Sequence, residues 1–460
     1  MARGQPNPRL AALLGEAGWS AAELARAVNG LGAAQGLPLR YDRTSVAHWL
    51  AGSRPRPPVP ALVASAFSRR SGRLVAVEET GLARHGPASG DPLPPRRSAQ
   101  DDVLDRLAAL CRADADPARR VPLAGSAYSL VAAAEPAWRR VRPAGPTPGR
   151  APALVPRATT ADLQRMRWMI LVCADLMERH GGAHARTAVT AYIADDTNSV
   201  LAAPAPPALR RDLFTGAGQL THLLGRMSMD AGHQGLAQHY FTASLGLARE
   251  ADDRRLYAIT LRAMSLQALH LGFLEQAWHL ADAAVDSAGS RTDPSTRAFL
   301  LSQRGLSHAH ARHRREAVGD LVTAEAQHDR ATSPAGPFTA YPRPGLDYQR
   351  GRALLALGDP VRAVQALGTA AGARAGDRHR SSALTRARLA ETLLALGRLE
   401  ESCVHWHVFL DHYPSLRSVT ADRALRHLRT SLRGFRRQPH AAAVLRRARA
   451  LTPRPGQQVL

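Results

Sequence analysis

Residues 353–358 read Ala-Leu-Leu-Ala-Leu-Gly, and two other parts of the chain, residues 268–272 and 393–397, end a leucine-rich run with glycine in the same way. A glycine directly after a helix adopts the left-handed conformation at little cost, so the chain can reverse and pack a second helix on the first. Helix-period segments follow one another from Thr160 to about Leu432, whereas alternating strand-like runs are almost absent. The sequence therefore predicts an all-α protein with repeated helical pairs.

Small residues begin the second helix of each predicted pair. In the first unit, Leu224 and Gly225 precede Ala237 and Phe241, and this order of small and large residues resembles that of tetratricopeptide repeats. Later units have Ala277, Ala317, Ala363 and Ser402 at the position of Ala237. Their separation of about 40 residues exceeds the roughly 34 residues of the tetratricopeptide consensus. We expect the units to stack into a right-handed α-solenoid with a concave surface, because no unit can bury its apolar face alone.

The N-terminal residues predict a compact module of three helices. Gly18 ends the first helix, and Ser20 with Glu23 forms a capping box for the second. Asp42 caps the third helix and Gly52 ends it, with a long glycine-rich loop expected over residues 30–41. Apolar residues line the inner faces of the three helices: Leu10, Leu13, Leu14, Ala17, Leu24, Val28, Val46, Trp49 and Leu50.

Residues 43–52 resemble the recognition helix of the phage-repressor-like helix-turn-helix family, in which a Trp-Leu-x-Gly ending is followed by basic residues and proline. The resemblance implies that four side chains face base edges in the major groove of double-stranded DNA: Arg43, Thr44, Ser45 and His48. It also implies that Arg54 and Arg56 bind phosphates. The alternative interpretation is an ordinary solvated face for Arg43, Arg54 and Arg56, with His48 a surface histidine.

The whole arrangement resembles a family of actinobacterial helix-turn-helix regulators with tetratricopeptide-like C-terminal domains, which includes negative regulators of differentiation and antibiotic production. Residues 7–57, 181–186 and 227–241 carry this resemblance. It implies a sequence-specific, repressor-like transcriptional regulator, expected to be a homodimer, whose repeat domain mediates dimerisation and binds a protein, peptide or small-molecule effector in its groove. The alternative is a tetratricopeptide scaffold or ligand sensor that acts through protein–protein interaction without direct DNA binding.

Four parts are expected along the chain. These are a helix-turn-helix DNA-binding domain (1–83), a linker and helical connector (84–157), a tetratricopeptide-like repeat domain (158–435) and a basic C-terminal tail (436–460). Proline-rich residues 84–97 and 142–156 predict linkers, and residues 101–140 show helical spacing without an interpretable motif. Six arginines between residues 423 and 437 predict a solvated capping helix, with a second phosphate-binding surface as the alternative.

Net charge is weak support for a polyanionic partner. The formal charge is +23, but all 61 basic residues are arginine, as a GC-rich coding sequence produces. A Walker motif is impossible without lysine, and no GxSxG or HExxH motif has the required context. Two histidine groups, His308, His310 and His313 and then His405, His407 and His412, invite a metal hypothesis, but the two histidines of each His-x-His pair do not share a helix face. We therefore expect no catalysis, no cofactor and no metal site.

The cysteines and the apolar segments predict the compartment. Cys111, Cys173 and Cys403 lie far apart, which fits small buried residues in a reducing compartment. The most apolar stretch, residues 166–177, is too short to span a bilayer, and no signal peptide precedes the first helix. We expect a cytoplasmic protein without membrane contact, nucleoid-associated when it is bound to DNA.

Overall fold

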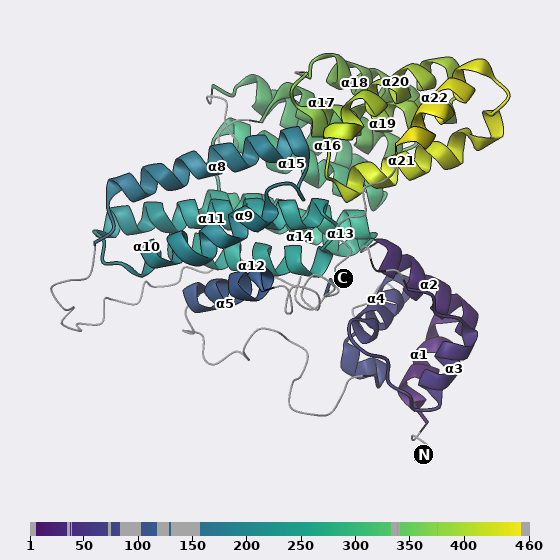
Figure 1. Ribbon diagram of the computed structural model, residues 1–460, viewed down its shortest axis with the longest axis horizontal. Coiled ribbons are helices and arrows are strands. Elements are labelled where there is room, and N and C mark those ends of the chain that lie inside the picture. The colour runs from purple at the N-terminus through teal and green to yellow at the C-terminus, as the bar shows by residue number, and fades with distance from the viewer. Residues whose placement is uncertain are drawn as a thin grey trace.

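The computed structural model describes most of the chain: residues 6–34, 37, 39–71, 75–82, 103–116, 128–129, 157–332, 338, 341–374 and 376–451. Every regular element in these ranges is a helix and none is a strand, which confirms the predicted all-α fold class. A small N-terminal bundle is followed by a long array of paired helices (Figure 1). No helix in the described ranges is both long and apolar enough to cross a membrane.

The N-terminal bundle begins as the capping residues predict. Its elements are α1 (Pro8–Ala17), α2 (Ala21–Ala34), α3 (Arg43–Leu50), α4 (Val59–Ser71) and the short η1 (Val77–Thr80). Gly18 has φ 62° at the end of α1, and the Ser20 backbone N–H donates to Glu23 at 2.8 Å. The predicted core residues are buried except Leu50, which is half-buried. Two elements that the sequence did not predict, α4 and η1, complete this core.

The loop expected over residues 30–41 is shorter than predicted, because α2 continues through Gly30 to Ala34. Leu31 is buried, so the helix gains apolar contact by extending. Gly32 lies against Leu39, whose Cδ1 would be 2.6 Å from a Cβ at this position. The Asn29 side chain donates to the Tyr41 carbonyl at 2.7 Å and accepts from its N–H at 2.9 Å. These two bonds hold Tyr41, just before α3, against α2.

Five antiparallel helical pairs form the array. They are α11 (Pro207–Asp230) with α12 (Gln234–Glu250), α13 (Arg254–Leu271) with α14 (Leu274–Ala288), α15 (Pro294–His310) with α16 (Arg314–Asp329), α17 (Arg343–Ala356) with α18 (Pro360–Gly372), and α19 (His379–Ala395) with α20 (Leu399–His412). The small residues predicted near the start of each second helix are fully buried. Gly225 lies against Phe241, as the repeat pattern predicts: a Cβ there would be 2.7 Å from the ring. The predicted helical-repeat architecture is confirmed.

The turn within each pair requires a left-handed residue. Gly272, Gly358 and Gly397 have φ values of 81°, 83° and 76°, which confirms the three turns predicted from sequence. Gly232 (φ 92°) and Arg312 (φ 66°) occupy the same turn in the other two pairs. Because Arg312 is not glycine, the glycine pattern did not predict the turn of this pair. Its guanidinium donates to the Ala356 carbonyl at 2.7 Å, so it also links this turn to the next unit.

Gly397 and Gly368 offer a test in which the same substitution has opposite effects. Neither glycine has an atom within 4 Å of a Cβ position, but Gly397 has φ 76° whereas Gly368 lies inside α18. Gly397→Ala is expected to destabilise by about 1 kcal/mol through backbone strain. Gly368→Ala is expected to stabilise by about 0.5–1 kcal/mol, because alanine loses less conformational entropy in a helix. Thermal unfolding measures both changes, and equal signs would contradict the assigned turn.

The described part of the uninterpreted segment 101–140 includes a helix of the array's core. Helix α5 (Val103–Ala115) packs against α12 and α9 (Arg186–Tyr192), and its Leu107, Leu110 and Cys111 are buried. All three cysteines are free and buried, as predicted. Burial raises the pKa of the Cys111 thiol to about 12, and Asp114 contributes. The linkers predicted at residues 84–97 and 142–156 lie outside the described residues.

The array extends beyond the boundary predicted at residue 435. After α21 (Val419–Ser431) and η4 (Leu432–Phe435), helix α22 (Pro439–Ala450) packs against α20. The expected basic tail 436–460 is therefore wrong over α22, whose apolar residues at helical spacing are buried: Ala441, Val444, Leu445 and Ala448. Arg429 of the predicted arginine-rich helix donates to the Ala448 and Leu451 carbonyls at the end of α22. One of its six arginines therefore caps a helix.

Asp230 joins the beginning of the array to its end. Its fully buried carboxylate pairs with Arg380 of α19 at 2.9 Å and accepts from the Ser418 hydroxyl at 3.0 Å and the Gly182 N–H at 2.8 Å. Helix α8 (Thr160–His180) packs against both α11 and α19, so it bridges the first and the last of the five pairs. Gly181 has φ 81°, and a Cβ there would be 2.7 Å from the Arg417 carbonyl oxygen. The array closes on itself through these contacts.

Candidate nucleic-acid interface

Helix α3 is anchored by its inner side and its N-terminal cap. Val46 and Trp49 are buried, and the Trp49 ring meets Tyr41 edge-on at 5.1 Å between centroids. The Asp42 carboxylate accepts from the Ser45 N–H at 2.9 Å, as the predicted cap requires. The hydrogen bond from Ser45 holds the pKa of Asp42 below its ordinary value, so the cap is ionised at neutral pH. The outer side of α3 is thereby held in a fixed orientation.

Three of the four predicted base-contacting residues share the exposed side of α3. Arg43, Thr44 and His48 are exposed, and Thr44 and His48, which are four residues apart, lie on one helical face. Ser45 is half-buried instead, and its hydroxyl donates to the Asp42 carboxylate at 2.9 Å. Ser45 therefore completes the capping box, and it can reach a base only by giving up this bond.

The arginines around α3 carry uncompensated charge. Arg54 and Arg56, which are exposed in the turn after α3, form no ion pair with any described residue, and the same holds for Arg43. Arg40 is also exposed, two residues before the cap, and the sequence pattern missed it because it lies outside the helix. A helix N-terminus favours anions, so an arginine beside it adds to the attraction for phosphate.

The N-terminal bundle meets the array through α4. The Arg69 guanidinium carbon lies 5.9 Å from the centre of the Phe273 ring, and its Nη2 would be 2.6 Å from a Cβ at Gly272. This contact is at the turn between α13 and α14. Figure 1 shows α4 on the side of the bundle nearer the array and α3 on the far side. The outer face of α3 is therefore left open.

A second group of arginines lies on the helices of the array, where Arg262 is buried, Arg388 is exposed and the others are half-buried. We call it the inner arginine cluster: Arg226 of α11, Arg262 of α13, Arg352 of α17, Arg388 of α19 and Arg423 of α21. Arg226, Arg262 and Arg352 form no ion pair with any residue that the structure describes. Burial lowers the pKa of Arg262 to about 10, and the charges of Arg226 and Arg352 lower it further against the opposing effect of Tyr341.

Burial and the positive charge of this cluster lower the pKa of two nearby histidines. Burial lowers the pKa of His270 to about 3, and Arg352, Arg388 and Arg423 contribute, although solvent reaches the side chain. The pKa of His310 falls to about 4 for the same reasons, with Arg352 and Arg388 as the main charges. Both histidines are therefore neutral at pH 7. The sequence patterns did not predict this cluster. When the pairs are aligned by their turn glycines, Arg226 and Arg352 both stand six residues before the glycine.

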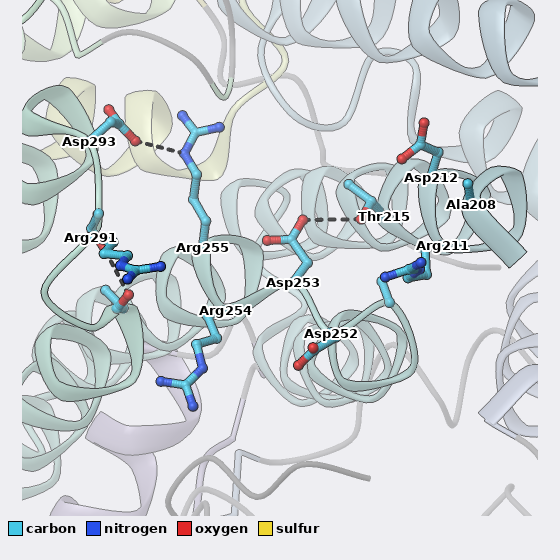
Figure 2. A pocket seen from close by; sticks show the side chains of 13 residues that line it. Ala208, Arg211, Asp212, Thr215, Asp252, Asp253, Arg254, Arg255, Arg291 and Asp293 are labelled. Atoms are coloured by element: carbon cyan, nitrogen blue, oxygen red, sulfur yellow. Dashed lines mark hydrogen bonds and ion pairs between the residues drawn. The ribbon is translucent and has the colours of Figure 1, made fainter. Parts of the chain in front are cut away.

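An open cleft of about 640 Å³ lies at the edge of the array, between the turns that join successive pairs. Figure 2 shows both arginines and aspartates around it, among them Arg211, Arg291 and Asp293. Asp253 accepts from the Thr215 hydroxyl at 3.1 Å, and Asp293 pairs with Arg255 at 3.2 Å. Both aspartates also cap helices, α13 and α15. The charges of this cleft therefore balance one another.

The described histidines considered as metal ligands do not come together in the groups of three that the sequence suggested. The Nδ1 atoms of His308 and His313 are 3.2 Å apart, and those of His379 and His412 are 2.9 Å apart. Among the described residues no three histidine, cysteine or acidic side chains come together as a metal site would require.

The described residues thus define an all-α protein that combines a small helical bundle with a closed array of helical pairs. Residues 10–83 match a family model described as the SP15 N-terminal domain. This range begins at the third residue of α1 and includes the rest of the bundle through η1. No curated protein sequence matches the chain.

Proposed function

We propose that this chain is a sequence-specific DNA-binding transcriptional regulator, repressor-like in its action, with α3 as its recognition helix. The observation that carries the proposal is the outer side of α3, where Arg43, Thr44 and His48 are exposed together on a capped and anchored helix. Arg54 and Arg56 flank it without ion-pair partners among the described residues. An unpaired arginine can donate two hydrogen bonds to the O6 and N7 of guanine.

The helical array supplies association and effector binding in this proposal. A single helix reads few bases, so a homodimer on paired half-sites is expected. Trp168 and Leu171, three residues apart on α8, are 63% and 54% exposed and are suited to apolar contact with a second chain. The same pair supports the alternative function, a scaffold that binds proteins without contacting DNA. The proposed localisation is cytoplasmic, on the nucleoid when DNA is bound.

Arg43 provides the direct test of the recognition helix. On the genomic fragment that the protein binds best, Arg43→Ala is expected to weaken binding by roughly 1–3 kcal/mol, or about 5- to 150-fold, because one base-edge contact is lost. Binding to unrelated DNA should change much less. Gel-shift titration measures both, with Arg211→Ala as the matched control because Arg211 is exposed on the array. An unchanged sequence preference in Arg43→Ala would refute the assignment of α3.

The salt dependence of binding separates the two proposed functions. If Arg54, Arg56 and their neighbours displace counterions from phosphates, affinity should fall steeply between about 50 and 200 mM salt. The scaffold alternative predicts no retention on DNA even at the lower salt concentration.

A further inference from the structure

We propose that the inner arginine cluster is a binding site for a small molecule that carries several phosphate groups. This names the chemical class of the effector in the proposed function, and it rests on that function only for the effect of binding on DNA affinity. The site belongs to the array alone.

The register of the helical pairs brings the cluster together. Arg226 and Arg352 occupy equivalent positions on α11 and α17, and His270 and His310 each stand two residues before a turn residue. Arg262 of α13 reaches α15, with its guanidinium carbon 3.5 Å from the centre of the Phe299 ring and its Nε donating to the Phe299 carbonyl at 2.9 Å. The Arg262 guanidinium is therefore held by the Phe299 ring and carbonyl rather than by a carboxylate.

Positive charge exceeds negative charge in this part of the array. Arg388 pairs with Glu391 at 2.9 Å, and Arg380 is taken up by Asp230 and Glu178. Arg226, Arg262 and Arg352 form no ion pair with any described residue, although the charges of Glu178 and Asp230 also act on Arg226. Gathering like charges in a recessed place destabilises a fold unless an anion offsets them. An anionic ligand would offset this excess of positive charge.

Phosphate fits this site better than other anions. The guanidinium fork donates two parallel hydrogen bonds to phosphate oxygens, so a group of such forks suits a ligand with several phosphates. Tyr348 adds an aromatic ring, with the guanidinium carbons of Arg352 and Arg374 each 5.8 Å from its centre. The occupant is small because the bonds of Asp230 close the array around these helices, while solvent still reaches His270.

Sodium tripolyphosphate is the probe for this site. Calorimetric titration of the full-length protein at low salt is expected to show one site per chain. The double variant Arg226→Gln, Arg352→Gln should bind at least about tenfold more weakly, because each arginine supplies charged hydrogen bonds. The matched control is Arg211→Gln, Arg291→Gln, which removes two exposed arginines from the mixed-charge cleft of Figure 2. Its affinity should stay within about twofold of the wild type.

Three outcomes would overturn the proposal: no binding by the wild type, equal weakening in both double variants, or equal affinity for citrate, which has carboxylates in place of phosphates. Thermal unfolding is the second readout, since tripolyphosphate should raise the Tm of the wild type and the control but not that of the cluster variant. Arg43→Ala should retain tripolyphosphate binding, and the cluster variant should retain DNA binding. Failure of either proposal is thus visible separately.

Discussion

Replacing Asp230 with asparagine is expected to lower the free energy of unfolding by about 3–5 kcal/mol, because Arg380 then keeps its charge in a largely buried place without its main partner. The Asp230 side chain is fully buried, and Arg380 is 15% exposed. Glu178 cannot replace the lost carboxylate, since it lies 3.8 Å from Arg380 whereas Asp230 lies at 2.9 Å. Urea unfolding followed by tryptophan fluorescence measures the loss.

The matched control is Asp411→Asn, which breaks an exposed pair with Arg447 at 2.6 Å. An exposed pair contributes less than about 1 kcal/mol, so this variant should unfold almost as the wild type does. Hydrogen exchange locates the effect of Asp230→Asn. Protection should fall in α8, α19 and α21, where the array closes, and remain in α14. A uniform loss of protection would contradict a role for Asp230 in joining the two ends.

The pH dependence of the same variant has a defined sign. Burial alone would raise the pKa of Asp230, but Arg380 and the hydrogen bonds from Gly182 and Ser418 hold it below its ordinary value of 3.8. A carboxylate with a lowered pKa stabilises the fold above its unfolded pKa, and this contribution is lost as the pH falls through the folded pKa. The difference between wild type and Asp230→Asn should therefore be constant above about pH 5 and shrink below about pH 4.

Local sequence patterns predicted the parts of this fold that depend on neighbouring residues. The capping residues Ser20, Glu23 and Asp42 and the turn glycines Gly272 and Gly397 act within a few residues of the chain, so their chemistry is legible in sequence. The same logic failed where a side chain broke the local rule. Arg312 takes a left-handed turn without being glycine, and Gly30 continues a helix that packing of Leu31 extends.

Long-range contacts decided what the sequence left open. Asp230 and Arg380 are 150 residues apart, and no local pattern marks either as a partner of the other. The inner arginine cluster likewise depends on how successive helical pairs align, and the number of residues between pairs varies. Because arginines occur throughout the chain, these five did not stand out in the sequence. The exposure of the outer residues of α3 was predictable because the helix itself was predictable from its cap and its apolar residues. Ser45 was predicted to contact a DNA base, but in the structure its hydroxyl donates to the Asp42 carboxylate.

Asp114→Asn is expected to destabilise the array by about 3–5 kcal/mol, because it leaves Arg186 as an unpaired buried cation. The Asp114 carboxylate lies 2.5 Å from Arg186, whose side chain is only 8% exposed. Tyr240 donates its hydroxyl to the same oxygen at 2.7 Å. These bonds join α5 to α9 and α12. The variant should therefore lose protection from hydrogen exchange first in α5.

A second substitution tests whether charge is the cause. Arg186→Met in the Asp114→Asn background removes the stranded cation and keeps an apolar chain of similar length. Replacing both partners of a buried ion pair costs far less than removing one, so the double variant should recover more than half of the lost stability. Asp175→Asn, which breaks an exposed 2.7 Å pair with Arg179, should stay within about 1 kcal/mol of the wild type. If the double variant is no more stable than Asp114→Asn alone, the bond from Tyr240 rather than the ion pair holds α5 in place.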